Sequence, residues 1–153
     1  MRLSSKARYA VMAMVDLARH SNGHPVSLAD IAGREELSLA YLEQLFAKLR
    51  RSGLVKSVRG PGGGYLLAYD ADATRIADII AAVGEPLHAV RCTPGAALGC
   101  RGNRSRCLTH DLWEELGNQI RLYLSSVSLG DVCEKRVLGT SGIPQRQGYQ
   151  AAQ

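Results

Sequence analysis

Apolar residues recur every three or four positions in the first part of the chain, which is the repeat of one face of an α-helix. This pattern predicts a helix over residues 4–20 with Ser4 as its N-cap, a short helix after Ser27, and a third helix over residues 39–52 after Ser38. The inner faces expected for the three helices are Ala7, Ala10, Val11, Met14, Leu17 and Ala18; Leu28, Ile31 and Ala32; and Leu42, Leu45, Phe46 and Leu49.

The third predicted helix turns a polar and basic face outward, made of Ala40, Tyr41, Glu43, Gln44, Ala47, Lys48 and Arg51. Two short helices across a tight turn, the second with such a face, are typical of a helix-turn-helix. Two β-prone runs follow, residues 54–59 and 65–67, around a Gly-Pro-Gly-Gly-Gly turn. They predict a hairpin, the wing of a winged helix. A phosphate cradle is disfavoured because no Gly-Lys-Ser/Thr follows the glycines.

The second half of the chain predicts a helix over residues 76–83, stopped by Gly84-Glu-Pro86, and a long helix over residues 111–127 with Thr109 as its cap. A further helical turn is expected over residues 128–133, and the Gly/Gln/Ser-rich tail from Gly139 is expected to be disordered. The long helix carries an apolar stripe that has two interpretations: it forms the interface of a homodimer (the seam), or it packs inside the same chain as an ordinary core helix. The seam reading assigns dimerisation to Leu112, Trp113, Leu116, Ile120, Tyr123 and Leu124.

Positive charge is concentrated in the predicted helix-turn-helix and wing. The net charge is +5, and the twelve residues from Lys48 to Arg59 hold five basic residues and no acid. Such a patch favours a polyanionic partner. Arg51, Lys56 and Arg59 are expected to contact phosphates, and Arg101, Arg104 and Arg106 form a second basic cluster.

Glu43 is unusual on a helix that faces a phosphate-lined groove. It belongs there if it accepts a hydrogen bond from a base edge, with cytosine N4 as the natural donor, or it is a surface carboxylate near Lys48.

The apolar runs are too short to span a bilayer, and the first residues carry no secretory signal, so we expect a cytoplasmic protein without a membrane partner. In that compartment four cysteines indicate metal or redox chemistry rather than structural disulfides. Cys133 follows Val132 in an apolar context and is expected to pack as a small hydrophobe.

Three cysteines and a histidine lie between positions 92 and 110, spaced Cys-x7-Cys-x6-Cys-x2-His, in a segment with little apolar bulk. Soft ligands of this kind suit Zn(II) or an iron–sulfur cluster. Structural zinc sites usually have tighter Cys-x2–4-Cys knuckles, so the wide spacing favours a cluster. A histidine must lose its proton to bind, which makes the site weaker and pH-sensitive, as suits a sensor. A thiol enzyme is disfavoured because the sequence shows no oxyanion-hole constellation.

Several stretches resemble the IscR family of bacterial iron–sulfur cluster regulators, and together they span residues 1 to about 133. They are the N-terminal Met-Arg-Leu-Ser-Ser-Lys-Ala-Arg-Tyr-Ala-Val, Tyr41-Leu-Glu-Gln-Leu-Phe46, Val58-Arg-Gly-Pro-Gly-Gly-Gly-Tyr-Leu-Leu67, Cys107-Leu-Thr-His-Asp-Leu-Trp113 and Ser128-Leu-Gly-Asp131. Two departures stand out: the gaps between the three cysteines are longer than in the family pattern, and Ala40 stands where relatives often have serine.

The resemblance implies a homodimeric transcription factor that binds two half-sites of double-stranded DNA. It implies a [2Fe-2S] cluster on Cys92, Cys100, Cys107 and His110, supplied by the cluster-assembly machinery, and repression of cluster-assembly genes when the cluster is present. The apo form would bind a second class of DNA site, with Glu43 helping to exclude it from the first. The DNA-contacting set is expected to be Ser38, Tyr41, Glu43, Gln44, Lys48, Arg51, Lys56, Arg59 and Gly60.

The expected fold class is therefore mainly α with a small β-hairpin. A winged helix-turn-helix domain would occupy residues 1–70, a linking helix 71–91, a cluster-binding loop 92–110, a long dimerisation helix with its following turn 111–133, and a disordered tail 134–153. The alternatives are a nitric-oxide or redox sensor of the same superfamily with a [4Fe-4S] cluster, and a zinc-stabilised winged-helix adaptor.

Overall fold

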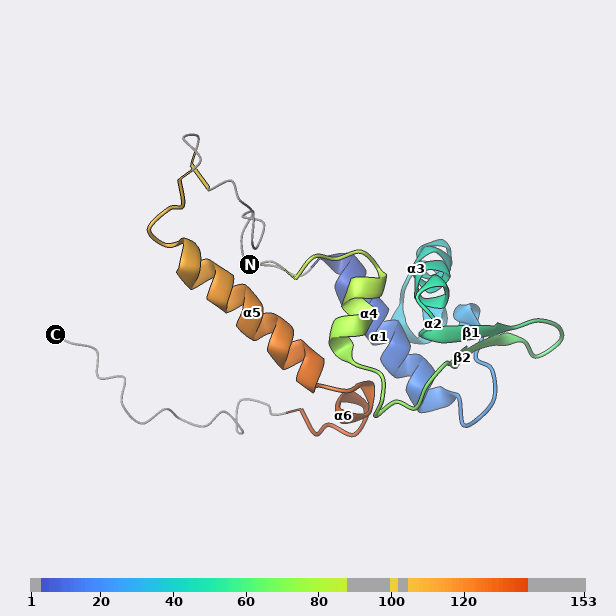
Figure 1. The fold of residues 1–153 in the computed structure, drawn as a ribbon. Helices are drawn as coiled ribbons and strands as arrows, with labels where there is room; N and C mark the ends of the chain where they lie inside the picture. The colour runs from blue at the N-terminus through green and yellow to red at the C-terminus, as the bar shows by residue number, and fades with distance from the viewer. Residues whose placement is uncertain (1–3, 88–99, 102–104, 138–153) are drawn as a thin grey trace.

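The computed structural model describes residues 4–87, 100–101 and 105–137. Its elements, shown in Figure 1, are α1 (Ser5–His20), α2 (Leu28–Glu35), α3 (Leu39–Arg51), β1 (Val55–Val58), β2 (Gly64–Leu67), α4 (Ile76–Ala82), α5 (His110–Ser126) and α6 (Leu129–Cys133). The predicted fold, mainly helical with a small hairpin, is confirmed. Cys92, Arg104 and the tail from Gly139 lie outside the described residues.

Helix α1 begins at the predicted cap. The Ser4 hydroxyl accepts the N–H of Ala7 at 3.5 Å and donates to Glu85 Oε2 at 2.7 Å. Glu85 follows α4, so the start of α1 is tied to the segment that leads toward residues 92–110, called the cysteine-rich loop below. Most of the predicted apolar face is buried, and Ala13 and Asp16 join it.

An ion pair that the sequence analysis did not predict joins α1 to α2, between a buried carboxylate and a partly exposed guanidinium. Arg34 donates from Nε and Nη2 to the two carboxylate oxygens of Asp16, at 2.9 and 2.7 Å. The hydrogen bond that Arg34 donates to Asp16 raises the pKa of Arg34 above its ordinary value. Because Asp16 is only 3% exposed, this two-point contact satisfies a charge that would otherwise be costly to bury.

Helices α2 and α3 form the predicted helix-turn-helix. Glu36 ends α2 in the left-handed conformation, with φ 53° and ψ 42°, and the Ser38 hydroxyl caps α3 by accepting the Tyr41 N–H at 3.4 Å. The predicted inner face of α3 is buried as expected, comprising Leu42, Leu45, Phe46 and Leu49. This packing fixes which side of α3 faces outward.

The wing is an antiparallel hairpin in which Val55 pairs with Leu67 and Val58 with Gly64. Gly60 and Gly62 take φ values of +103° and +70° in the turn, which explains the need for glycine there. On the turn side of the hairpin, Tyr65 of β2 pairs with Ser57, forms a bridge with Val26 and packs edge-on to Phe46 of α3, with ring centroids 4.9 Å apart. The wing is thereby fixed against α3, the second helix of the helix-turn-helix, which is called the recognition helix.

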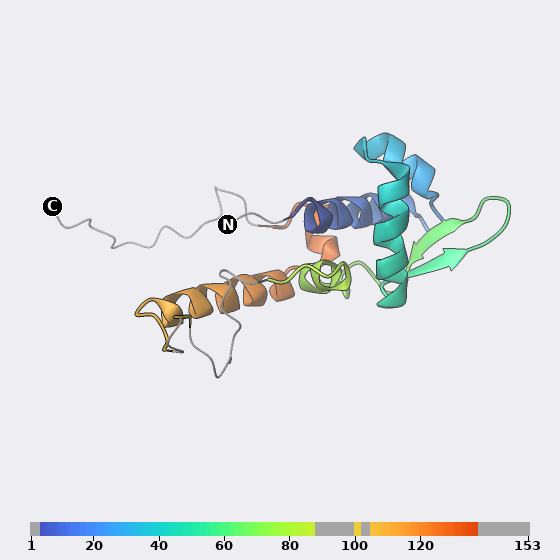
Figure 2. The ribbon, with the colours of Figure 1, turned by 90° about the horizontal axis from the view of Figure 1, so that it is seen from above.

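Helices α4 and α6, which follow the wing in the sequence, pack against the core of the winged helix. Helix α4 packs against α1, α3 and α5, and α6 packs against α1. Leu129 is fully buried in the same core as α1 and α3. Figures 1 and 2 show α5 extending away from this core on the side opposite the wing.

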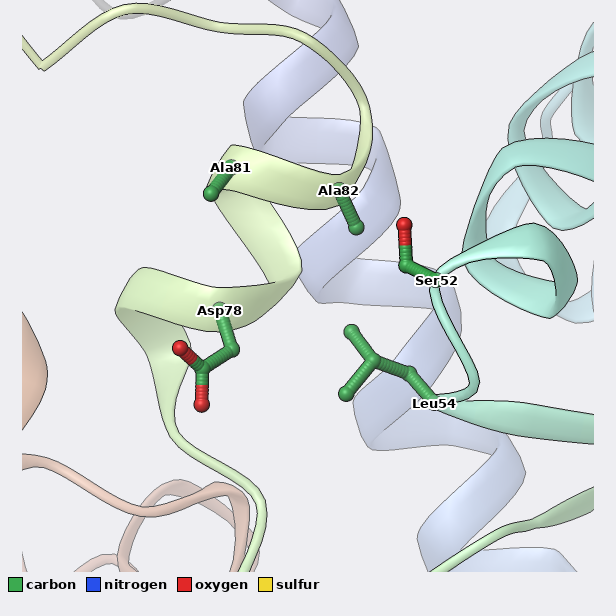
Figure 3. Close-up of a pocket in the computed structure, with 5 residues that line it drawn as sticks. All are labelled: Ser52, Leu54, Asp78, Ala81 and Ala82. Carbon is green, nitrogen blue, oxygen red and sulfur yellow. The ribbon is translucent and has the colours of Figure 1, made fainter.

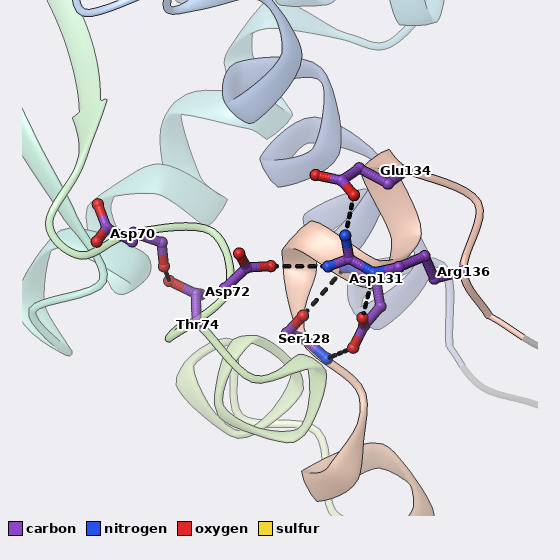
Figure 4. Close-up of polar contacts among 7 residues, drawn as sticks. All are labelled: Asp70, Asp72, Thr74, Ser128, Asp131, Glu134 and Arg136. Atoms are coloured by element: carbon purple, nitrogen blue, oxygen red, sulfur yellow. Dashed lines mark hydrogen bonds and ion pairs between the residues drawn. The ribbon is translucent and has the colours of Figure 1, made fainter.

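Polar contacts hold α6 against the turn before α4 (Figure 4). Ser128 and Asp131 form a reciprocal capping box, and a backbone bridge links Ser128 to Arg75. Arg136 pairs with Asp131 and Asp72 at 3.0 and 2.9 Å, and also with Glu134. Thr74 donates to the Asp70 carbonyl at 3.1 Å in the same turn.

The start of helix α5 differs from the prediction that Thr109 caps it. Thr109 occupies the N-cap position, but its side chain makes no capping hydrogen bond, because its backbone, with φ −101° and ψ 7°, is not in the extended conformation of an N-cap. Its hydroxyl instead accepts the indole N–H of Trp113 at 3.2 Å. The helix also begins one residue earlier than predicted, at His110. Across the described stretches, the helices are too short or too polar to cross a bilayer.

Candidate functional site

The outward face of α3 presents three of the predicted DNA-contacting side chains. Ser38, Glu43 and Gln44 are exposed, while the opposite side of the helix is buried. Glu43 and Gln44 are neighbours in the middle of the helix, where a recognition helix in a major groove would meet base edges.

Two other predicted residues lie at the margin of this face. The Tyr41 ring is half-buried and stands edge-on to Tyr9 of α1, with centroids 6.0 Å apart. Lys48 is also half-buried, and its Nζ donates to the carbonyl oxygen of Val83 at 3.3 Å. Val83 is the C-cap of α4, so Lys48 satisfies a helix-end carbonyl and links the recognition helix to α4.

Basic residues continue from the end of α3 onto the wing. Arg51, Lys56, Arg59 and Gly60 are all exposed. Arg51 donates to the carbonyl of Ala47 at 3.3 Å, and Lys56 pairs with Leu66 in the hairpin. Helix α3 packs on β1, so the basic end of α3 and the basic hairpin are neighbours in the fold.

A shallow hollow separates the end of α3 from α4 (Figure 3). It measures about 420 Å³ and is lined by Ser52, Leu54, Asp78, Ala81 and Ala82. Asp78 is its one charged lining residue and is itself exposed, so the hollow lacks the convergent polar groups of a specific ligand pocket.

The structure brings together two of the predicted metal ligands. Cys100 Sγ lies 2.9 Å from His110 Nδ1, and His110 is 7% exposed at the start of α5. The backbone N–H of His110 also donates to the carbonyl of Cys107 at 3.1 Å, which places Cys107 one turn before it. Cys92, the fourth predicted ligand, lies outside the described residues.

The Cys107 thiol has a polar neighbour of its own. Its Sγ lies 3.7 Å from Thr109 Oγ1, which already accepts the Trp113 indole N–H. The Thr109 hydroxyl is thereby shared between Cys107 and Trp113.

The second ring nitrogen of His110 is buried without a hydrogen-bond partner among the described residues. The nearest carboxylate is Glu114, whose Oε2 lies 3.5 Å from His110 Nε2. Asp111 completes a group of three side chains whose ligand atoms lie within 4.8 Å of one another, but it is 87% exposed and pairs with Arg106 at 3.6 Å.

Cys133 stands apart from this group, as expected. Its Sγ donates to the Val15 carbonyl at 3.9 Å, and the side chain packs against the core. Burial raises the pKa of the Cys133 thiol, which disfavours the thiolate.

Sequence reasoning missed Thr109, Trp113 and Glu114 as neighbours of the ligands. The four-residue spacings from Thr109 to Trp113 and from His110 to Glu114 were the available signal, because such pairs meet on one helix face.

An exposed recognition helix beside a basic hairpin defines a winged-helix DNA-binding protein. The chain belongs to the Rrf2 family, described as iron-dependent transcriptional regulators, whose model matches residues 3–135. It is accordingly a DNA-binding transcriptional regulator and not an enzyme.

Similar proteins are regulators as well. The chain is 54% identical to the HTH-type transcriptional regulator IscR of Photorhabdus laumondii over 143 residues, covering 93% of this chain and 85% of that protein. It is 50% identical to IscR of Escherichia coli, covering 93% and 86%.

Among solved structures, T. potens IscR matches with a TM-score of 0.71 and 37% identity, covering 97% of this chain and 95% of that one. CymR, the global cysteine regulator of B. subtilis, matches with a TM-score of 0.74 and 33% identity, covering 88% and 98%.

Proposed function

We propose that this regulator senses iron–sulfur cluster supply, and that it represses cluster-assembly genes when it holds a [2Fe-2S] cluster on Cys92, Cys100, Cys107 and His110. The assembly machinery would supply the cluster, and the protein would act in the cytoplasm as a homodimer on two half-sites of DNA. The similarity to IscR proteins supports this regulation.

The observation that carries the proposal is the contact between Cys100 Sγ and His110 Nδ1 at 2.9 Å. Two ligands of one tetrahedral metal lie roughly 3.5 Å apart, given metal–sulfur and metal–nitrogen bonds of about 2.3 and 2.0 Å. A small opening of this pair would therefore admit an iron ion. When bound, an iron–sulfur cluster would supply a charge and a set of crosslinks that are absent from the apo protein.

The residues around the pair fit a cluster better than a single hard cation. The three-membered group His110, Asp111 and Glu114 contains no thiolate, and one of its carboxylates is turned toward Arg106. Thiolates and imidazole in one loop instead suit iron–sulfur chemistry.

The path from the site to DNA would run through α4. Helix α5 carries the histidine and packs on α4, whose C-cap carbonyl receives Lys48 of the recognition helix. Glu85, between α4 and the cysteine-rich loop, also holds the N-cap of α1. A change in the loop would thus reach two helices of the DNA-binding domain.

The exposed apolar stripe of α5 supports the homodimer. Leu112, Trp113 and Tyr123 are exposed, and His110 is the one buried residue in α5. A stripe of this size on one helix is typical of a protein–protein contact, and a second copy would cover it symmetrically.

Anaerobic purification followed by absorption spectroscopy and analysis of iron, sulfide and zinc tests the cofactor. We expect a coloured protein with two irons and two sulfides per chain, as the proposed cluster formula requires. A colourless protein with one zinc per chain would support the adaptor alternative, and a [4Fe-4S] spectrum would support the nitric-oxide or redox sensor.

A further inference from the structure

The geometry points to Glu114 as the residue that holds the cluster's histidine in position: His110 binds iron through Nδ1, and Glu114 accepts the hydrogen bond from Nε2–H. This inference rests on the proposed cluster site. It adds a positioning residue outside the four ligands and specifies which ring nitrogen binds.

The two ring nitrogens of His110 face different neighbours. Nδ1 of His110 faces the Cys100 sulfur at 2.9 Å, whereas Nε2 faces Glu114 Oε2 at 3.5 Å. Iron shared with Cys100 must therefore meet Nδ1, because Nε2 lies on the other side of the imidazole ring.

A neutral imidazole carries one proton, on one of its two nitrogens. A ring that gives its Nδ1 lone pair to a metal carries its proton on Nε2, which is then a hydrogen-bond donor. In His110 this nitrogen is buried and lacks a partner among the described residues. A buried donor without an acceptor is costly, so the carboxylate beside it gains a role once Nδ1 is bound.

The two carboxylates near His110 differ in exposure and in partner. Asp111 is 87% exposed and pairs with Arg106 at 3.6 Å. Glu114 is 29% exposed and sits one helical turn after His110, so its oxygen already faces the ring. A carboxylate acceptor on the second nitrogen of a ligating histidine fixes the ring and increases its basicity.

The helix offers a matched control in the next residue. Glu115 carries the same charge and is exposed, and its Oε1 accepts from Gln119 at 2.6 Å. Glu114→Gln and Glu115→Gln therefore remove the same charge from adjacent positions, of which only the first faces His110.

Reconstitution of the full chain with ferrous iron and sulfide under anaerobic conditions allows two measurements. Hyperfine spectroscopy of the reduced cluster, on protein grown with histidine labelled with ¹⁵N at Nδ1 or at Nε2, identifies the bound nitrogen. We expect a strongly coupled ¹⁵N signal with the Nδ1 label alone, and its loss in His110→Ala.

The second measurement compares reduction potential and cluster lifetime. Glu114→Gln keeps an acceptor oxygen but removes the charge, so the potential should rise while the lifetime stays near that of the parent protein. Glu114→Ala removes the acceptor and should shorten the lifetime about tenfold. Glu115→Gln and Glu115→Ala should change both quantities much less.

The outcomes separate this inference from the proposed function. Strong coupling to Nε2, or equal effects at Glu114 and Glu115, would overturn the role of Glu114 while leaving the cluster site intact. A chain that binds no cluster, or a cluster without strong nitrogen coupling, would overturn the proposed ligand set itself.

Discussion

At the scale of single residues, Asp16 and Arg34 show how one charged pair fixes the angle between two helices. Asp16 lies on the core side of α1, and Arg34 reaches it from the last turn of α2 with two hydrogen bonds. His20 Nδ1 also lies 2.8 Å from the Asp16 carbonyl oxygen. The pair therefore orients α2, which supports the recognition helix.

We expect Asp16→Asn to lower the free energy of unfolding by about 2 kcal/mol, because a charged hydrogen-bonded pair is broken at a buried position. Urea unfolding of the apo protein measures this, together with Arg34→Met and the double variant. The pair is coupled if the double variant loses less than the sum of the single losses. Strict additivity of the two single effects would contradict the coupling.

Glu43 is an exposed carboxylate on α3, so we expect its removal to change the DNA sequence preference rather than the affinity for all DNA. Glu43→Ala should relax base preference at one position per half-site, by about 1–3 kcal/mol of discrimination. Selection of binding sites from random DNA measures it. Arg51→Ala is the control, because loss of a phosphate contact should weaken all sequences alike. Uniform weakening by Glu43→Ala would assign it a structural role.

The residue-level expectations from sequence succeeded where the determinant is local. Ser4, Ser27 and Ser38 cap their helices because a hydroxyl at that position needs only the next turn as a partner. Thr109 makes no capping hydrogen bond because its backbone is not extended as it is at the three serine caps. Asp16 was not expected in the core because its partner is eighteen residues away on another helix.

At the scale of elements, the stability of the short helix α6 depends on the charge of Asp131. The hydrogen bonds from Ser128, and the contact with Arg136, lower the pKa of Asp131 to about 2. The folded state therefore favours the ionised carboxylate, and its stabilising effect is present above the ordinary pKa near 4. That effect is lost as the pH falls from about 4 to about 2.

Asp131→Asn should therefore be less stable than the parent protein at pH 5, with a difference that shrinks toward zero at pH 2. Thermal unfolding across this range measures the trend. Asp78→Asn, at an exposed position in the first turn of α4, controls for general loss of negative charge. A stability difference that stays constant from pH 5 to pH 2 would contradict the role of Asp131 ionisation.

Element boundaries were predictable to within one or two residues, because apolar periodicity and glycine positions define them locally. The position of α6 in the fold was not predictable in this way. Its place on α1 depends on the bridge between Arg75 and Ser128 and on the burial of Leu129, which join positions far apart in the sequence. A five-residue helix carries too few apolar residues to indicate its partner.

At the scale of the whole molecule, the proposed dimer depends on the stripe of α5. Leu112 and Leu122 are 60% and 59% exposed, but only Leu112 lies on the stripe with Leu116 and Tyr123 at helical spacing. Leu112→Ser should raise the dimer dissociation constant about a hundredfold, since a symmetric interface loses the side chain twice at about 1.5 kcal/mol each.

Sedimentation at several concentrations measures this, with Leu122→Ser as the matched control that should leave the dimer intact. A monomeric parent protein, or equal weakening by both variants, would contradict the stripe as the seam.

The candidate metal site was predictable as a set of residue types but not as a constellation. Cysteines and a histidine in one polar loop indicate a soft metal site from sequence alone. The orientation of the His110 ring depends on Cys100 and Glu114 together, ten residues before it and one turn after it. Ligand spacing does not encode that orientation.

The burial of Leu129 beside α1 also bears on how the protein is made. Ile79, Ile80 and Leu129 are fully buried in the core that supports the recognition helix, so a nascent chain that ends before them lacks part of that core. Because Leu129 follows residues 92–110 in the sequence, the DNA-binding half gains its complete core only after that segment has been synthesised. A chain with the complete core therefore already carries the segment that is proposed to control DNA binding.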